Sequence, residues 1–122
     1  MTTATAKLNN YRQSPRKVRL VANAIRGKKA IDAASDLEFI TKRSSLPILK
    51  LLNSAIANAK ASGINTENLV VSKIEVNPGK ILYRRMPVSR GSAHPIRKRT
   101  SHVSIVLEEK IKPVKTKVSK EK

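Results

Sequence analysis

The chain has 122 residues, the length of one domain, and its 26 lysine and arginine residues against 8 acidic residues give a formal charge of +18. It has no cysteine, which excludes disulfide scaffolds, thiolate zinc sites and cysteine nucleophiles, and no apolar run long enough to span a membrane. The hydrophobic fraction of 39% suffices for one modest core, and two tyrosines and one phenylalanine are too few for base-stacking RNA-recognition folds. The composition therefore predicts a small cytosolic protein that binds a polyanion.

The first ten residues alternate weakly between polar and apolar side chains and predict an edge strand. A helix follows, because Ser14 is a good N-cap and Pro15 a good first helical residue. Gly27 can adopt the left-handed conformation that ends a helix. One face of this helix is apolar and another is a cationic ridge. The apolar arc holds Val18, Val21, Ala22 and Ile25, and the cationic arc holds Arg16, Arg19, Asn23 and Arg26.

Two more helices are predicted, a short one over residues 28–39 and a longer one over residues 45–62. Leu46, Leu49 and Leu51 widen the apolar arc of the longer helix, so we expect it to be the buried spine of the domain. Its main apolar stripe is Ile48, Leu52, Ala55, Ile56 and Ala59.

The second half of the chain is rich in strand signals. Residues 69–76 predict a strand, and residues 77–79 (NPG) are by themselves typical of a turn. Residues 81–88 are a further β-rich run, residues 89–93 form a turn-like tip, and residues 99–107 predict the last strand.

These elements predict an α+β fold: a small antiparallel sheet packed with about three helices, plus a long protruding β-hairpin. We expect residues 1–110 to form a single domain, with the hairpin over about residues 77–102. Residues 111–122 are a basic, lysine-rich tail without periodicity, which is typical of disorder.

The predicted hairpin has cations on both of its faces. Arg84 and Arg90 alternate with Arg85, so neither face is a continuous apolar surface of the kind that packs on a core. An extended run over residues 76–88 would reach about 40 Å, well beyond a core of this size. Because an isolated two-stranded ribbon is marginal in water, such an arm requires an anionic partner around it.

The cations gather in two stretches that contain no acidic residue, one before Asp32 and one over residues 76–107. Local ion pairs cannot neutralise them, so contact with phosphates is expected. The two stretches contain Lys7, Arg12, Arg16, Lys17, Arg19, Arg26, Lys28 and Lys29, then Lys80, Arg84, Arg85, Arg90, Arg97, Lys98 and Arg99.

No residues predict catalysis, a metal site or a cofactor site. His94 and His102 stand without cysteine or acid between them, so each is expected to contact phosphate or solvent. The acidic residues are scattered and the four glycines are isolated, so neither a paired-carboxylate site nor a phosphate loop is predicted. An alternative class is a DNA-compacting architectural protein, for which residues 86–88 (MPV) could form an apolar wedge.

Three motifs together resemble the universal large-subunit ribosomal protein twenty-two family, bacterial type, over about residues 4–109. Residues 11–22 (YRQSPRKVRLVA), closing with IRG at 25–27, are similar to the opening of that family. Residues 54–59 (SAIANA) resemble its long-helix signature, and residues 96–102 (IRKRTSH) resemble its returning hairpin strand.

The resemblance implies a structural protein of the cytoplasmic large ribosomal subunit, with a body on the outer surface and a hairpin that threads into the RNA. It implies large-subunit rRNA, neighbouring ribosomal proteins and the nascent peptide as partners, and that residues 77–79 bend within a continuing strand. The rRNA-binding residues are then Arg12, Arg16, Lys17, Arg19, Lys80, Arg84, Arg85, Arg90, Arg97, Lys98, Arg99 and His102.

The resemblance also implies that the hairpin tip lines the peptide exit tunnel near its narrowest part. The tip residues are Met86, Pro87, Val88, Ser89, Arg90, Gly91, Ser92, Ala93 and His94.

Overall fold

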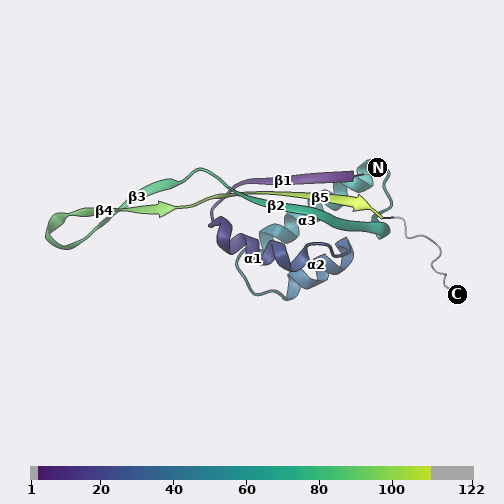
Figure 1. The fold of residues 1–122 in the computed structure, drawn as a ribbon, viewed down its shortest axis with the longest axis horizontal. Coiled ribbons are helices and arrows are strands. Elements are labelled where there is room, and N and C mark those ends of the chain that lie inside the picture. Colours follow the sequence, from purple (N-terminus) through teal and green to yellow (C-terminus); the bar gives the residue numbers. More distant parts are fainter. Residues whose placement is uncertain (1–2, 111–122) are drawn as a thin grey trace.

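The computed structural model describes residues 3–110 and consists of a body, with three α-helices and a three-stranded sheet, and a two-stranded arm that projects from it (Figure 1). The predicted tail, residues 111–122, lies outside the described residues. The elements in chain order are β1 (Thr3–Tyr11), α1 (Pro15–Ile25), α2 (Ala30–Phe39), α3 (Ser45–Ala61), η1 (Thr66–Asn68), β2 (Leu69–Pro78), β3 (Leu82–Pro87), η2 (Ser89–Gly91), β4 (Ala93–Lys98) and β5 (Ser101–Glu109).

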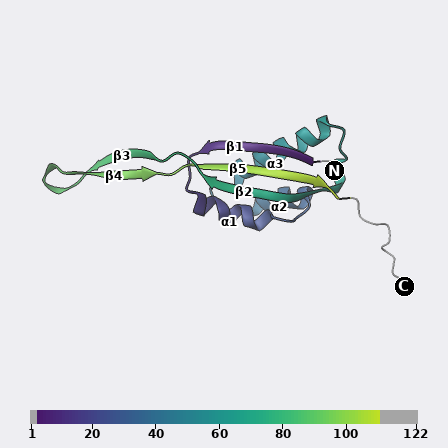
Figure 2. The same ribbon diagram turned by 45° about the horizontal axis from the view of Figure 1, so that its top comes forward.

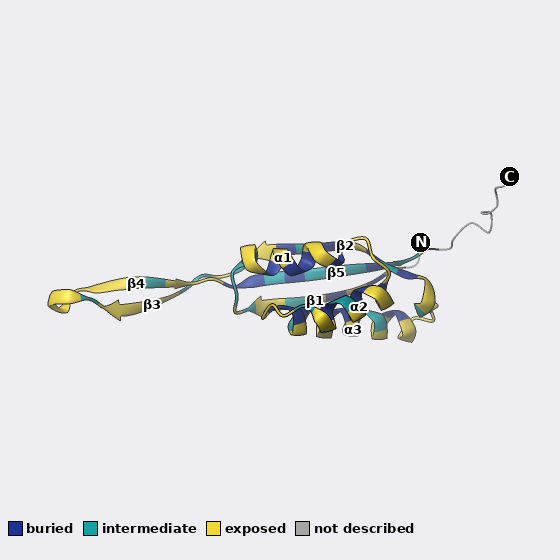
Figure 3. Cartoon of the chain, turned by 90° about the horizontal axis from the view of Figure 1, so that it is seen from below, coloured by how far each residue is buried: buried dark blue, intermediate teal, exposed yellow. Residues whose placement is uncertain are grey.

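The sheet of the body is antiparallel, with strand order β1-β5-β2, so β1 is an edge strand as predicted. Along the central strand β5, buried residues alternate with half-buried ones, because the helices cover one face of the sheet (Figures 2 and 3). The first strand and the last lie side by side, and Thr3 pairs with Glu108. The α+β architecture with a protruding hairpin is confirmed.

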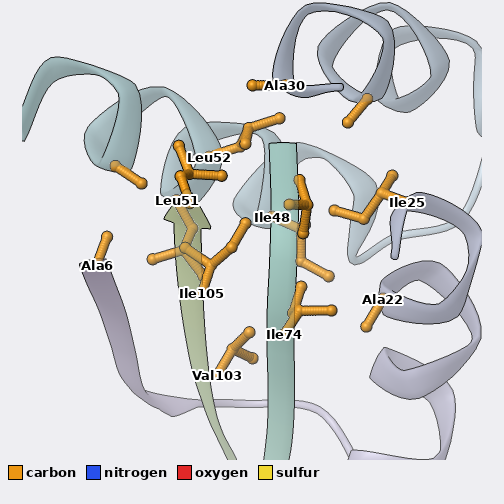
Figure 4. Close-up of a cluster of buried hydrophobic side chains, with 14 of the residues drawn as sticks. Ala6, Ala22, Ile25, Ala30, Ile48, Leu51, Leu52, Ile74, Val103 and Ile105 are labelled. Carbon is orange, nitrogen blue, oxygen red and sulfur yellow. The ribbon is translucent and has the colours of Figure 1, made fainter. Parts of the chain in front are cut away.

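The core lies between this face of the sheet and the helices (Figure 4). Ile48 and Leu52 of α3 are fully buried together with Ile105 of β5, and Ile25 of α1 and Ile74 of β2 belong to the same cluster. Complete burial of a side chain of this size stabilises the fold by about 1.5–3 kcal/mol. The apolar arcs predicted for the first and third helices therefore form the core.

Helix α3 is less buried than predicted at its start. Leu51 is buried and Leu49 is half-buried, but Leu46 is 58% exposed. The reason is its direction: Leu46 lies beside the edge strand β1 rather than over the sheet, and it lines a groove with Leu8. The expectation that all three leucines widen the buried face was wrong for Leu46.

Helix α2 begins two residues later than the predicted start at residue 28, because β2 holds the preceding segment. The amide of Gly27 donates to the carbonyl oxygen of Val71 at 3.0 Å, and the amide of Val71 donates to that of Lys28 at 2.8 Å. A β-bridge then joins Lys29 to Val70. Gly27 has the predicted left-handed conformation, with φ +80°.

The turn that residues 77–79 predict locally is wrong, because strand β2 runs to Pro78 and its pairing extends to Gly79. Pro78 pairs with Ser101, and the amide of Gly79 donates to the carbonyl oxygen of Thr100 at 2.9 Å. The continuing strand that the resemblance implied is confirmed as far as Gly79, and β3 begins three residues later, at Leu82. The pairing of β2 with β5 is also longer than expected at its other end, because Leu69 pairs with Glu109, two residues beyond the predicted end of the last strand.

The arm is the antiparallel pair of β3 and β4, in register from Leu82 opposite Lys98 to Pro87 opposite Ala93. None of the residues from 80 to 99 is buried, so the arm has no core of its own. Mixed, exposed faces were predicted from the alternation of the sequence, and the structure has them.

Where the arm leaves the body, the hydrogen bond of Gly79 with Thr100 and three others form what we call the junction. Thr100 is buried and its Oγ1 donates to the carbonyl oxygen of Lys80, and the buried Ser101 Oγ donates to that of Gln13 at 2.6 Å. On β1, a bulge brings Asn10 to φ +59°, where its amide donates to Nδ1 of His102 at 3.1 Å. The junction therefore links β1, β2 and β5 at the base of the arm.

Candidate nucleic-acid interface

Cations from separate parts of the chain meet in a concave surface beside the junction, which we call the larger hollow. Its volume is about 670 Å³, and six of its eight lining residues are lysine or arginine, with no acidic residue among them. The lining comes from the β1–α1 loop, α1, the α2–α3 loop and the end of β4: Arg12, Gln13, Ser14, Lys17, Arg43, Arg97, Lys98 and Arg99.

A second concave surface, the smaller hollow, lies next to it and shares Ser14 and Arg99. Its volume is about 420 Å³, and its other lining residues are Pro15, Arg16, Arg19 and Pro78. Ser14 is the N-cap residue of α1, but its side chain makes no capping hydrogen bond. The partial positive charge of this helix start thus adds to the cations of both hollows.

Part of the cationic ridge on α1 binds the chain itself. The Nε and Nη2 groups of Arg19 donate to the carbonyl oxygen of Val76 at 3.2 and 3.0 Å, and Nη2 of Arg26 donates to that of Ile74 at 2.7 Å. These arginines cover the outer edge of β2 and protect it from pairing with another strand. Because a guanidinium has five N–H groups, Arg19 keeps donors for a further partner.

On the arm, cations lie on both faces of the ribbon. The register places Tyr83 opposite Arg97, and Arg85 two residues further along the same face. Arg84 and Lys98 lie on the other face. No acidic residue occurs in the sequence between Glu75 and Glu108, so nothing on the arm neutralises them.

At the end of the arm, the chain reverses through η2. Arg90 and Gly91 both have left-handed backbone conformations, with φ +61° and +71°, and the amide of Val88 donates to the carbonyl oxygen of Ser92 at 2.8 Å. The predicted tip, residues 86–94, lies at this end, which is the part of the arm farthest from the body (Figure 1).

Elsewhere on the body, two lysines are paired with acids. Lys28 binds Asp36, and Nζ of Lys73 lies 2.8 Å from Oε1 of Glu75. The hydrogen bond and the charge of Lys73 hold the pKa of Glu75 below its usual range, and Glu75 raises the pKa of Lys73. Paired lysines have less charge to offer a phosphate, so the paired region differs from the two hollows.

The described part of the chain, residues 3–110, has neither a cluster of metal-ligating side chains nor a membrane-spanning helix. No group of three or more histidine, cysteine, aspartate or glutamate side chains there could hold a metal ion. No helix in this part of the chain is long and apolar enough to cross a membrane.

Comparison with known proteins identifies the family of the chain. The family model described as Ribosomal protein L22p/L17e matches residues 6–108. The chain belongs to the L22p/L17e family of ribosomal proteins. A curated relative, the large ribosomal subunit protein uL22 of Buchnera aphidicola subsp. Cinara cedri, is 47% identical over 105 residues, which cover 85% of each chain. The resemblance in the three sequence motifs is thus confirmed.

Of the residues expected to bind rRNA in this L22-family chain, the hollows bring seven together: Arg12, Arg16, Lys17, Arg19, Arg97, Lys98 and Arg99. Lys80 lies at the junction, and Arg84, Arg85 and Arg90 lie apart along the arm. His102 is half-buried, and the contact described for it is the one with Asn10 inside the chain. Its role in RNA binding remains a prediction.

Arg43, which lines the larger hollow from the α2–α3 loop, was not among the residues predicted to bind RNA. A signal was present, because Lys42 and Arg43 form an exposed basic pair between two helices. The pair lies outside both acid-free stretches, so charge runs alone do not predict it.

Proposed function

We propose that this L22-family chain is a structural protein of the large ribosomal subunit, where it binds and organises large-subunit rRNA by neutralising phosphates. One observation carries the proposal: three segments distant in sequence bring six cations and no carboxylate to the larger hollow. Such a concentration of like charge disfavours the free chain, and phosphates that enter the hollow remove the repulsion.

Phosphate binding also releases counterions from the RNA, which favours association at low salt. The larger hollow can hold backbone from one RNA segment while the arm contacts others, because cations point from both faces of the ribbon. RNA helices that repel one another are then held together by one chain. This is the sense in which the protein organises the RNA.

The proposal also accounts for the arm. With no buried residue between 80 and 99, the arm gains its order from contacts outside the chain. Structured RNA on both sides of the ribbon would supply these contacts. The tip, residues 86–94, would then lie deep in the RNA, where we propose that it lines the peptide exit tunnel and faces the nascent peptide.

The first test compares single substitutions in an rRNA-binding assay. Arg97→Ala and Arg99→Ala are each expected to lower the affinity for a large-subunit rRNA fragment about tenfold, or about 1.4 kcal/mol. Each should also reduce the slope of log K against log salt by about 0.7–0.9, the value for one phosphate contact. Lys60→Ala is the matched control, because Lys60 is exposed on α3 and lines neither hollow.

Far-UV circular dichroism of both variants should match that of the unchanged chain, because Arg97 and Arg99 are exposed and lie outside the helices. A loss of helicity would mean that the arginines support the fold. An equal loss of affinity in Lys60→Ala would mean that net charge, rather than the hollow, binds the RNA.

The second test is sedimentation of a cell lysate through a sucrose gradient in high salt. The chain should migrate with the large subunit after this wash. Release to the top of the gradient, or migration with DNA, would contradict the proposal. A DNA duplex that competes as well as structured rRNA would favour the architectural alternative.

The tip is tested by cross-linking in stalled ribosomes. A photoreactive residue in the nascent peptide, at the depth of the constriction, should cross-link to Arg90 or its neighbours in the tip. Cross-links to RNA and other proteins alone, at every depth along the tunnel, would contradict the tunnel assignment while leaving rRNA binding untouched.

A further inference from the structure

A groove of different character lies between the edge strand β1 and helix α3, which run side by side (Figures 2 and 3). We call it the edge groove, and its volume is about 370 Å³. Most of its lining is apolar, whereas cations make up most of the lining of the larger hollow and half of that of the smaller hollow. The lining residues are Lys7, Leu8, Tyr11, Leu46, Pro47, Lys50, Leu51 and Ser54.

The backbone of β1 is open on the side of this groove. The carbonyl oxygen of Thr5 points away from β5. It accepts a hydrogen bond from Nδ2 of Asn58, on α3, at 2.8 Å. The register of β1 with β5 is regular from Thr3 to Leu8, so the N–H and C=O of Lys7 point the same way as those of Thr5. Within residues 3–110, no hydrogen bond closes the edge at Lys7.

We propose that the edge groove binds an extended segment of a neighbouring protein, which adds a strand to β1 at Lys7 and places apolar side chains against Leu8, Leu46 and Leu51. Strand addition of this kind obtains affinity from main-chain hydrogen bonds and specificity from side-chain pockets. The exposed Leu46 then becomes buried. The proposal rests on the proposed place of the chain in the large subunit, which supplies the neighbour.

Charge selects the kind of segment. Lys7 on β1 and Lys50 on α3 line opposite walls of the groove, and no acidic residue lines it. The bound segment therefore has acidic side chains flanking its apolar ones. The chain's own residues 111–122 do not fit, because they contain five lysines and one glutamate. RNA is disfavoured because an aliphatic floor offers nothing to a phosphate, and a nucleic-acid backbone leaves the exposed Leu46 without an apolar partner.

Site-specific photo-cross-linking in assembled large subunits tests the proposal. With p-benzoylphenylalanine in place of Leu46, we expect a cross-link to a protein segment that has an acidic residue within three positions of the linked one. The same replacement at Ile31 is the matched control, because Ile31 is also 58% exposed but lies on α2, away from the groove. A cross-link from position 46 to RNA or to a second copy of this chain, or none at all, would overturn the proposal.

Charge reversal gives a second readout. Lys7→Glu and Lys50→Glu are expected to lower the yield of that cross-link at least fivefold, whereas Lys60→Glu, the same charge change on α3 outside the groove, leaves it unchanged. If all three substitutions lower the cross-link yield equally, the inference that the groove lysines select an acidic segment is overturned. If the unchanged chain itself fails to sediment with the large subunit, the proposed function fails instead.

The groove can then still be tested on the free chain. The probe is the peptide Glu-Val-Thr-Leu-Asp, acetylated and amidated at its ends, and the readout is the amide NMR signal of Lys7. A shift with this peptide but not with Lys-Val-Thr-Leu-Lys supports the proposal, and the absence of any shift overturns it.

Discussion

Replacing Gly79 with alanine is expected to destabilise the junction, although Gly79 does not need a left-handed conformation. A Cβ at this position would lie 2.6 Å from Oγ1 of Thr100 and 3.0 Å from Nε2 of His102. Neither neighbour is free to move: Thr100 is 3% exposed and donates to Lys80, and His102 accepts from Asn10. Close approach of two strands, rather than backbone freedom, is thus what requires glycine here.

The magnitude follows from two opposing effects. Overpacking by one methyl group among fixed neighbours costs about 1–3 kcal/mol. Alanine also reduces the conformational freedom of the unfolded chain, which stabilises the folded state by about 0.4–1 kcal/mol. The expected net loss of stability for Gly79→Ala is therefore about 1–2 kcal/mol, which urea titration followed by circular dichroism measures.

A double-mutant cycle identifies the clash. Thr100→Ala removes Oγ1, the atom nearest to the added methyl group, so the two substitutions together should cost about 1 kcal/mol less than the sum of the single changes. The contact with His102 remains, so the recovery is partial. Strict additivity, or a Gly79→Ala variant as stable as the unchanged chain, would refute the reasoning.

Three further outcomes are expected. Leu52→Ala should lower the free energy of unfolding by about 2–5 kcal/mol in urea titration, because the side chain of Leu52 is fully buried in the core. Lys73→Met should raise the pKa of Glu75 toward its ordinary value of 4.5, measured by NMR titration of the carboxyl group. In the unchanged chain the ion pair therefore supports folding above pH 4.5, and this support is lost as the pH falls through the lowered pKa or rises through the raised pKa of Lys73. Arg43→Ala should weaken rRNA binding and reduce its salt slope by about 0.7–0.9, and an unchanged slope would exclude Arg43 from phosphate contact.

Local signals in the sequence were sufficient for α1. Pro15 and Gly27 define its ends through backbone geometry, and the apolar spacing defines its buried face, so no distant part of the chain was needed. The start of α2 was missed because β2, more than forty residues later, holds Lys28 and Lys29 in a bridge. Strand pairing of this kind has no signature in the residues that it displaces.

The arm shows the same contrast. Residues 77–79 have the composition of a turn, and the pairing of Pro78 with Ser101 overrides that local preference. For the candidate site, charge runs were enough to predict the cations of the arm and of α1. Arg43 joins them only through the packing of α2 against α3, which brings the loop between these helices to the larger hollow. The hydrogen bonds from Arg19 to the carbonyl oxygen of Val76 could not be predicted either, because they depend on the packing of β2 beside α1.

The pairing of Thr3 with Glu108 has a practical consequence for studies of the assembled particle. Both residues lie at the end of the sheet opposite the arm (Figure 1), so an attached dye would be separated from the tip by the full length of the body and the ribbon. A fluorophore at either position can therefore report on the protein without obstructing the insertion of its arm. Two such dyes, one at each position, would also remain close together whenever the sheet is folded, and their energy transfer would follow folding of the body during assembly.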